Sequence, residues 1–125
     1  MRLLSVDDSM VVRKIIKAAV AVLDFDLEEA ENSIEAFEIL DKFNGVIDLV
    51  LLDWNMPGLS GYELLNALKK DIKYREIPVM MVTAESSKES IVNAIEAGAV
   101  NYMVKPFTME ELIKKIMECI GKGEA

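Results

Sequence analysis

Short apolar runs without polar–apolar alternation recur along this chain, and they restrict its possible folds more than any other feature. The clearest runs are Leu49–Leu52 and Val79–Val82. A strand that is apolar on both faces needs cover on both sides, which a parallel sheet obtains from helices packed on its two faces. The runs therefore predict an α/β protein whose sheet lies buried in the middle of the molecule.

Strand-like and helix-like segments alternate five times along the 125 residues. The pattern predicts strands at about 2–6, 26–30, 46–52, 77–82 and 100–104, and helices at about 10–23, 33–43, 61–71, 87–97 and 109–120. Parallel strands joined by helices almost always use right-handed crossovers, so we expect one parallel sheet with helices on both faces. The segment 26–30 is the most polar of these strands, which is typical of a sheet edge.

Four of the five expected helices begin with a pattern that caps a helix N-terminus. A Ser, Thr or Asn is followed three residues later by Glu, so that both side chains can bond exposed backbone N–H groups. The pairs are Asn32 with Glu35, Ser60 with Glu63, Ser86 with Glu89, and Thr108 with Glu111. These pairs predict where the four helices start.

Charged and hydroxyl residues stand at the ends of the expected strands. They are Asp7 and Asp8 after the first, Asp53 after the third, Thr83 at the end of the fourth and Lys105 after the fifth. In an open parallel sheet, ligands bind outside the carboxyl ends of the strands. Three carboxylates in one crevice repel each other, and a hard cation such as Mg²⁺ would balance their charge. The sequence thus predicts a divalent-metal site beside a carboxylate that can take a phosphoryl group.

Some of these residues also have a purely structural interpretation, whereas Asp53, between Leu52 and Trp54 with no basic residue nearby in the sequence, is harder to explain in that way. Asp8-Ser9 could be a helix cap, Thr83 could be an ordinary β-branched strand residue, and a lysine at a strand end is usually solvated. Pro106 restricts Lys105 to extended geometry and allows a cis peptide bond between them. Opposite three carboxylates, however, Lys105 is better explained as an ammonium paired with Asp53.

The composition argues against several function classes. A net charge of −8, from 14 basic and 22 acidic residues, argues against nucleic-acid binding. No signal peptide is visible, and no apolar run approaches the roughly 18 residues of a membrane span. The absence of histidine excludes Ser–His and Cys–His nucleophilic pairs and the usual zinc sites. The single cysteine, Cys119, fits a small core residue and a reducing, cytoplasmic setting.

Taken together, these segments resemble the receiver domain of two-component response regulators. The resemblance covers essentially the whole chain and rests on Asp7-Asp8, on Asp53 with Met56-Pro57-Gly58 behind it, on Thr83-Ala84 and on Lys105-Pro106-Phe107. The segments 53–57, 81–85 and 104–108 are most similar to the chemotaxis regulators of that family. The resemblance implies a single doubly wound, flavodoxin-like sheet of five parallel strands in the order 2-1-3-4-5. A receiver domain would span residues 1–121, with a short tail or truncated linker at 122–125.

The same resemblance implies a phosphoacceptor switch rather than an enzyme, with only self-catalysed phosphorylation and dephosphorylation. Asp53 would accept a phosphoryl group from a histidine kinase, which must be another molecule because this chain has no histidine. Lys105 and Thr83 would bind the phosphoryl oxygens. Mg²⁺ would be held by Asp7 or Asp8, by Asp53 and by the backbone carbonyl of Asn55.

The downstream partner is expected to bind a surface formed by the fourth helix, the fifth strand and the fifth helix. Thr83 and Tyr102 would act as the switch, and Ile91, Ile95, Tyr102 and Lys115 would contact the partner. The partners implied by the resemblance are a histidine kinase, a flagellar switch protein or another phosphorylation-dependent target, and a phosphatase. A monomer that binds neither nucleic acid nor a membrane is expected.

Other functions remain open at this point. Within the family, the chain could be a phosphorelay intermediate or a receiver module cut from a larger regulator. A haloacid-dehalogenase-type phosphatase would need a second acid where Asn55 stands. A flavodoxin would carry a phosphate loop rich in Ser, Thr and Gly after its first strand, whereas Asp7-Asp8 would repel a flavin phosphate.

Overall fold

The computed structural model describes residues 1–121, over which five strands and five helices alternate. The strands are β1 (Arg2–Val6), β2 (Asp26–Ala30), β3 (Leu49–Leu52), β4 (Val79–Thr83) and β5 (Asn101–Val104). The helices are α1 (Met10–Val22), α2 (Ser33–Lys42), α3 (Gly61–Lys70), α4 (Lys88–Glu96) and α5 (Met109–Gly121). The predicted tail at 122–125 lies outside the described residues.

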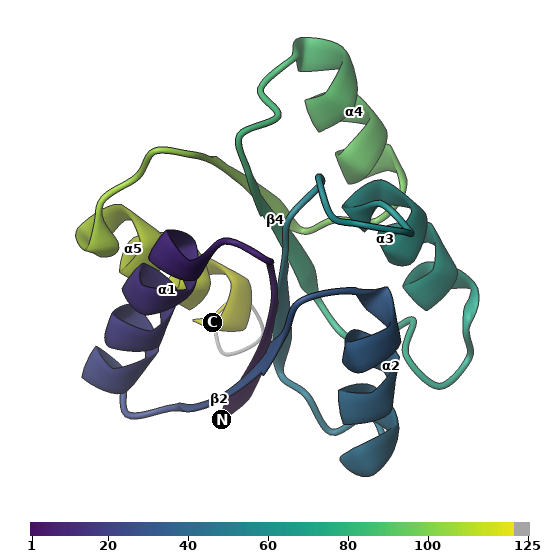
Figure 1. Cartoon of the computed structure of the whole chain (residues 1–125), viewed down its shortest axis with the longest axis horizontal. Coiled ribbons are helices and arrows are strands. Elements are labelled where there is room, and N and C mark those ends of the chain that lie inside the picture. Colours follow the sequence, from purple (N-terminus) through teal and green to yellow (C-terminus); the bar gives the residue numbers. More distant parts are fainter. Residues whose placement is uncertain (122–125) are drawn as a thin grey trace.

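All five strands pair in parallel, in the order β2-β1-β3-β4-β5. Figure 1 shows α1 and α5 together on one face of this sheet and α2, α3 and α4 on the other. The doubly wound fold and the strand order expected from the sequence are therefore confirmed. The polar segment β2 lies at one edge of the sheet, as predicted.

Each face of the sheet carries its own apolar core. In β3, Val50 and Leu52 pack into the cluster under α2, α3 and α4, while Leu49 and Leu51 pack into the cluster under α1 and α5. All four side chains are at most 1% exposed. Burying one such side chain stabilises the fold by about 1.5–3 kcal/mol. The absence of alternation in β3 thus follows from a sheet covered on both sides.

The strand β3 begins at Leu49, three residues later than the pattern predicted. The chain reaches it through a turn in which Asn44 and Gly45 adopt positive φ angles of 52° and 72°. The N–H groups of Val46 and Ile47 donate to carbonyls inside this turn, at 2.9 Å each, and so do not join the sheet. An apolar run that continues out of a turn therefore overstated the length of the strand.

Helix starts were predicted correctly except at α4. Ser60 and Thr108 each exchange both capping bonds with the Glu three residues later. The pairing of Ser86 with Glu89 is wrong, because Ser87 caps α4 and accepts from the N–H of Ser90 at 3.1 Å. The carboxylate of Glu85 accepts from the Ser87 N–H and the Ser90 hydroxyl, which extends the preceding loop by one residue.

Candidate functional site

The candidate site lies at the carboxyl edge of the sheet, where β1 and β3 run side by side. The chain leaves these strands at Asp7 and Asp53, and the Asp53 N–H donates to the Val6 carbonyl at 3.0 Å. The strand order reverses between β1 and β3, and the opening at such a point is where doubly wound sheets bind ligands. Topology thus brings together two acids that are far apart in the sequence.

Three carboxylates form a cluster at this edge. Asp7, Asp8 and Asp53 each contribute an oxygen that lies within 4.8 Å of the others. Asp7 and Asp53 are buried, with 2% and 6% exposure, whereas Asp8 is exposed. The cluster therefore has two acids at its floor and one at its rim, facing solvent.

The ammonium of Lys105 bridges the two buried acids. Its Nζ lies 3.0 Å from Asp7 Oδ2 and 3.3 Å from Asp53 Oδ2. The sequence predicted a pairing with Asp53 but not the shorter contact with Asp7. The peptide bond between Lys105 and Pro106 is cis.

Burial raises the pKa of the Asp7 carboxyl above its usual value, and the nearby charge of Asp53 adds to this increase. A bond from the Ser9 N–H, at 2.7 Å, and the contact with Lys105 both act in the opposite direction. The increase means that one ammonium does not fully offset the burial of this carboxylate. Hard oxygen donors with one solvent-facing side suit Mg²⁺, which keeps several of its waters when bound.

The loops that carry the acids are held by local hydrogen bonds. Ser9, not Asp8, caps α1, since the Ser9 side chain accepts from the Val12 N–H. Asp8 therefore lies in the acid cluster instead of acting as the cap that its local context allowed. The N–H of Asn55 points to Asp53 Oδ1 at 3.4 Å, so residue 55 lies directly beside the Asp53 carboxylate.

Thr83 and Tyr102 both bond the backbone of Glu85. The Thr83 hydroxyl, fully buried, accepts from the Glu85 N–H at 3.2 Å, and the Tyr102 hydroxyl donates to the Glu85 carbonyl at 2.6 Å. Burial, with the charges of Glu85 and Asp53, raises the pKa of Tyr102 to about 12. One residue of the loop after β4 thus connects the site to the tyrosine of β5.

The four residues predicted to contact a partner lie on or beside α4, β5 and α5. Ile95 is 46% exposed, while Ile91 and Tyr102 are half-buried. The Lys115 ammonium lies 3.4 Å from the Asn101 side-chain oxygen. The predicted surface is therefore accessible, with apolar residues on α4 and a lysine on α5.

Sequence reasoning missed two residues next to Asp53. The ring of Tyr62 stacks on Trp54, with centroids 4.9 Å apart and planes inclined by 9°. Gly61 lies directly against the backbone of Asp53. Gly61 carried a usable signal, because a glycine inside a helix start can mark a close approach of two backbone segments. No spacing rule predicts the aromatic stack.

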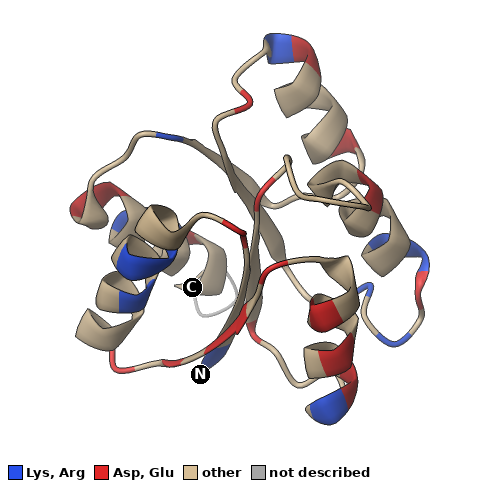
Figure 2. Cartoon of the chain, viewed as in Figure 1, with Lys and Arg blue, Asp and Glu red and all other residues tan. Residues whose placement is uncertain are grey.

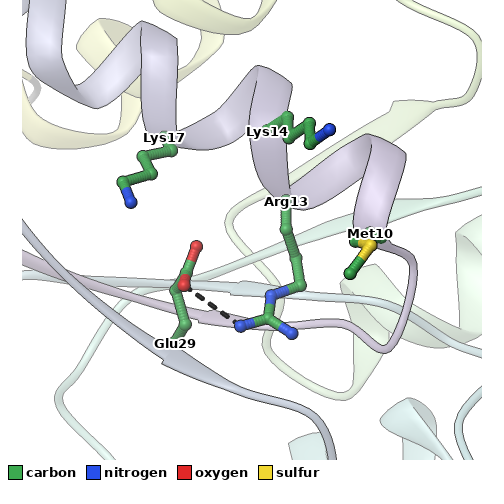
Figure 3. A pocket seen from close by; sticks show the side chains of 5 residues that line it. All are labelled: Met10, Arg13, Lys14, Lys17 and Glu29. Atoms are coloured by element: carbon green, nitrogen blue, oxygen red, sulfur yellow. Dashed lines mark hydrogen bonds and ion pairs between the residues drawn. The ribbon is translucent and has the colours of Figure 1, made fainter.

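A hollow of about 180 Å³ lies between α1 and β2 (Figure 3). It is lined by Met10, Arg13, Lys14, Lys17 and Glu29. The Arg13 guanidinium is engaged there, at 3.1 Å from Glu29 and 2.8 Å from Glu31, and these bonds raise its pKa further. None of the three clustered acids lines this hollow, so the chemistry belongs to the open edge of the sheet.

The charges are unevenly spread over the molecule. Figure 2 shows acidic residues in the loops that follow β1 and β3, and basic residues along α1. Within residues 1–121, no helix combines the length and the apolar character that crossing a membrane requires.

The fold and the acid cluster define a class, a doubly wound α/β domain with clustered carboxylates at the open edge of its sheet. The chain belongs to the response regulator receiver family, whose domain model matches residues 3–117. As a member, it is a response regulator and acts as a phosphoacceptor switch. The phosphatase and flavodoxin alternatives are thereby set aside.

Its relatives include chemotaxis proteins. A chemotaxis protein CheY homologue of Campylobacter jejuni is 41% identical over 124 residues, which cover 98% of this chain and 95% of the relative. The structure of chemotaxis protein CheY4 of Vibrio cholerae is similar, with a TM-score of 0.85 and 30% identity, covering 94% of this chain and 97% of that one.

A further similar structure contains a metal ion. It is the receiver domain of a sensor histidine kinase of Pseudomonas aeruginosa, with a magnesium ion coordinated in its active-site cleft. The TM-score is 0.84 at 26% identity, and the match covers 97% of this chain and 98% of that one. Receiver domains bind Mg²⁺ at an acidic pocket, and the clustered acids of this chain are compatible with that.

Proposed function

We propose that this chain is a chemotaxis response regulator in which Mg²⁺-dependent phosphorylation of Asp53 by a histidine kinase controls binding to the flagellar motor. The observation that carries the proposal is the buried Asp53 carboxylate, which Lys105 contacts at 3.3 Å within a cluster of two further acids. The names of the chemotaxis relatives support the choice of pathway.

Asp53 is the nucleophile of this reaction. One of its oxygens forms a bond to phosphorus while the phosphorus–nitrogen bond of the donor phosphohistidine breaks, and the electron pair leaves with the imidazole. Lys105 then binds a phosphoryl oxygen in place of part of its contact with Asp53. The Thr83 hydroxyl accepts from the Glu85 N–H, which leaves its own hydrogen able to bind a second phosphoryl oxygen.

Asp7, Asp8, Asp53 and the backbone carbonyl of Asn55 would hold Mg²⁺. The ion supplies positive charge that neutralises the transferring phosphoryl group, since phosphoryl transfer depends mainly on positioning and charge stabilisation. The product is an acyl phosphate, which water attacks readily. The same residues therefore support slow self-catalysed hydrolysis, and a partner phosphatase would accelerate it.

Phosphorylation would reach the partner surface through Glu85. A phosphoryl oxygen that draws the Thr83 hydroxyl towards Asp53 also strains the bond between Thr83 and the Glu85 backbone, to which Tyr102 is tied. Tyr102 belongs to β5, which contacts both α4, with Ile91 and Ile95, and α5, with Lys115. A shift of a few kcal/mol between two arrangements of this loop suffices to change partner affinity substantially.

Transfer from a phosphorylated histidine kinase tests the proposed function. The wild type and Asp41→Asn, which alters an exposed acid of α2, should take up the phosphoryl group and then bind a flagellar switch protein. Asp53→Asn should do neither. Equal capture of the switch protein by phosphorylated and unphosphorylated wild type would contradict the motor assignment. Normal phosphorylation of Asp53→Asn would contradict the site.

A further inference from the structure

The loop between β3 and α3 is tied at its neck by its own backbone. The chain leaves the sheet at Asp53 and enters α3 at Gly61, and the Gly61 N–H donates to the Trp54 carbonyl at 2.7 Å. This bond brings the two ends of the loop together. The residues from Asn55 to Ser60 therefore form a loop whose two ends are hydrogen-bonded to each other at its base.

Gly61 brings the first turn of α3 into contact with the backbone of Asp53. A Cβ at position 61 would lie 1.8 Å from the Asp53 carbonyl oxygen and 2.8 Å from the Trp54 Cα. Both neighbours are backbone atoms, which cannot swing aside as a flexible side chain can. Position 61 thus needs glycine for space, so that α3 presses directly on the residue that carries the phosphoacceptor carboxylate.

The stack of Trp54 on Tyr62 joins the same two segments through their side chains. Tyr62 follows Gly61 in α3, and its ring lies parallel to the Trp54 indole at 4.9 Å. The helix behind Tyr62 is a firm support, because Leu64, Leu65 and Leu68 are at most 2% exposed. Trp54 is therefore held by a backbone hydrogen bond and by a stacked ring on one fixed element.

Trp54 stands between the two residues that the proposed metal site uses. Its neighbours are Asp53, whose carboxylate would bind the ion, and Asn55, whose carbonyl would bind it. The N–H of Asn55 already points at Asp53 Oδ1, at 3.4 Å. Rotation of the peptide units on either side of Trp54 would displace the backbone of both Asp53 and Asn55. Holding Trp54 in place therefore restrains the backbone that carries both proposed ligands.

We propose that Gly61 and the Trp54–Tyr62 stack are positioning groups that set the geometry of the metal site. The inference rests on the proposed function, because the metal-binding role of Asp53 and Asn55 is itself proposed. Groups that orient metal ligands without touching the metal commonly affect affinity, since they remove the reorganisation that binding would otherwise require. Here the orienting group is an aromatic pair across the neck of a loop.

Calorimetric titration of the purified chain with Mg²⁺ alone tests this proposal. Tyr62→Ala removes the stack and should weaken Mg²⁺ binding by about three- to tenfold, the factor that one aromatic stack corresponds to. Tyr62→Phe keeps a stacking ring and should bind as the wild type does, within about twofold. Phe37→Ala disrupts a different aromatic pair, Phe37 with Tyr74 at 6.2 Å, and should also leave Mg²⁺ affinity within about twofold.

The outcomes separate this inference from the function on which it rests. If the wild type binds no Mg²⁺, the proposed metal site is wrong, and this inference falls with it. If the wild type binds Mg²⁺ and Tyr62→Ala binds it equally well, only the positioning role is wrong. Equal weakening in Tyr62→Ala and Phe37→Ala would show a general loss of stability and would also overturn the positioning role. Gly61→Ala is the less decisive variant, because its added methyl group would clash with the backbone of Asp53 and Trp54 and disturb folding itself.

Discussion

At the scale of single residues, the least favourable electrostatic arrangement described above is the burial of Asp7 next to Asp53. Burial disfavours the ionised form of Asp7 and raises its pKa, while a single ammonium, from Lys105, contacts both carboxylates. The Ser9 N–H holds one Asp7 oxygen in place at 2.7 Å. The arrangement holds the oxygens of the proposed metal site in position at the expense of stability when no further cation is bound.

The raised pKa of Asp7 predicts how the stability of the metal-free protein depends on pH. Because the pKa of Asp7 is raised in the folded state, its favourable contribution is fully present below its unfolded pKa and is lost as pH rises through the folded value. Asp7→Asn keeps an oxygen for the Ser9 N–H and cannot ionise. In EDTA, the variant should therefore gain stability relative to wild type as the pH rises from acid to neutral.

Urea unfolding at several pH values measures this difference. Asp41→Asn, which changes an exposed acid in α2, is the control and should follow the wild type across the same range. A difference between Asp7→Asn and wild type that does not change with pH would contradict the assigned cause.

At the scale of elements, the loop between β4 and α4 determines where α4 begins, and it carries the proposed route of signalling. Ser87 caps α4, and the Glu85 carboxylate accepts from Ser87 and Ser90. We predict that Ser87→Ala lowers the free energy of unfolding by about 1 kcal/mol, the usual effect of losing a helix cap. Ser86→Ala should change it by less than about 0.5 kcal/mol, as for other exposed positions. Equal effects of the two substitutions in urea unfolding would show that the cap is misassigned.

The start of α4 also shows what a local pattern leaves out. Ser86 and Glu89 satisfy the spacing of a capping box as well as Ser60 and Glu63 do. The choice of Ser87 depends on Glu85, whose side chain turns towards the helix instead of into solvent. Strand ends and most helix starts follow from local chemistry and could be predicted. This start depends on competing bonds between neighbours, which the spacing does not encode.

The face of α4, β5 and α5 gives a prediction for partner binding. Ile95 is 46% exposed in α4, and Ile34 is 72% exposed in α2, on a helix away from that face. With the beryllofluoride complex of the protein, Ile95→Ala should weaken capture of a phosphorylation-dependent partner by about tenfold, the order expected for one buried aliphatic contact at an interface. Ile34→Ala should bind normally. Weakened binding in Ile34→Ala alone would place the partner on another face.

At the scale of the whole molecule, the site forms where the order of the parallel strands reverses, between β1 and β3. The order β2-β1-β3-β4-β5 places the loops after β1 and β3 side by side, and β4 and β5 then add Thr83 and Lys105. These residues could be predicted because each lies at the end of a strand that the apolar pattern of the sequence identifies. The contact of Lys105 with Asp7, the close approach of Gly61 to the Asp53 backbone and the stack of Tyr62 on Trp54 could not be predicted. They depend on side-chain directions and on how closely α3 approaches β3.

The assembled site predicts that Mg²⁺ stabilises the whole domain. An ion that binds only the folded state adds about 2.7 kcal/mol when its concentration is a hundredfold above its dissociation constant. Thermal melts should therefore shift upwards by several degrees in Mg²⁺ relative to EDTA. Asp8→Asn, which removes the rim carboxylate, should melt higher than wild type in EDTA and respond less to Mg²⁺. A wild type with no response to Mg²⁺ would contradict the assembled site.

Asp53 is proposed to take up one phosphoryl group with the help of the clustered acids. Peptide mapping by mass spectrometry, after incubation with acetyl phosphate and reductive trapping of the acyl phosphate, tests it most directly. One residue, Asp53, should be modified in the presence of Mg²⁺ and none in EDTA. Modification of Asp7 or Asp8 with Asp53 unchanged, or equal modification of Asp53 in EDTA, would contradict it.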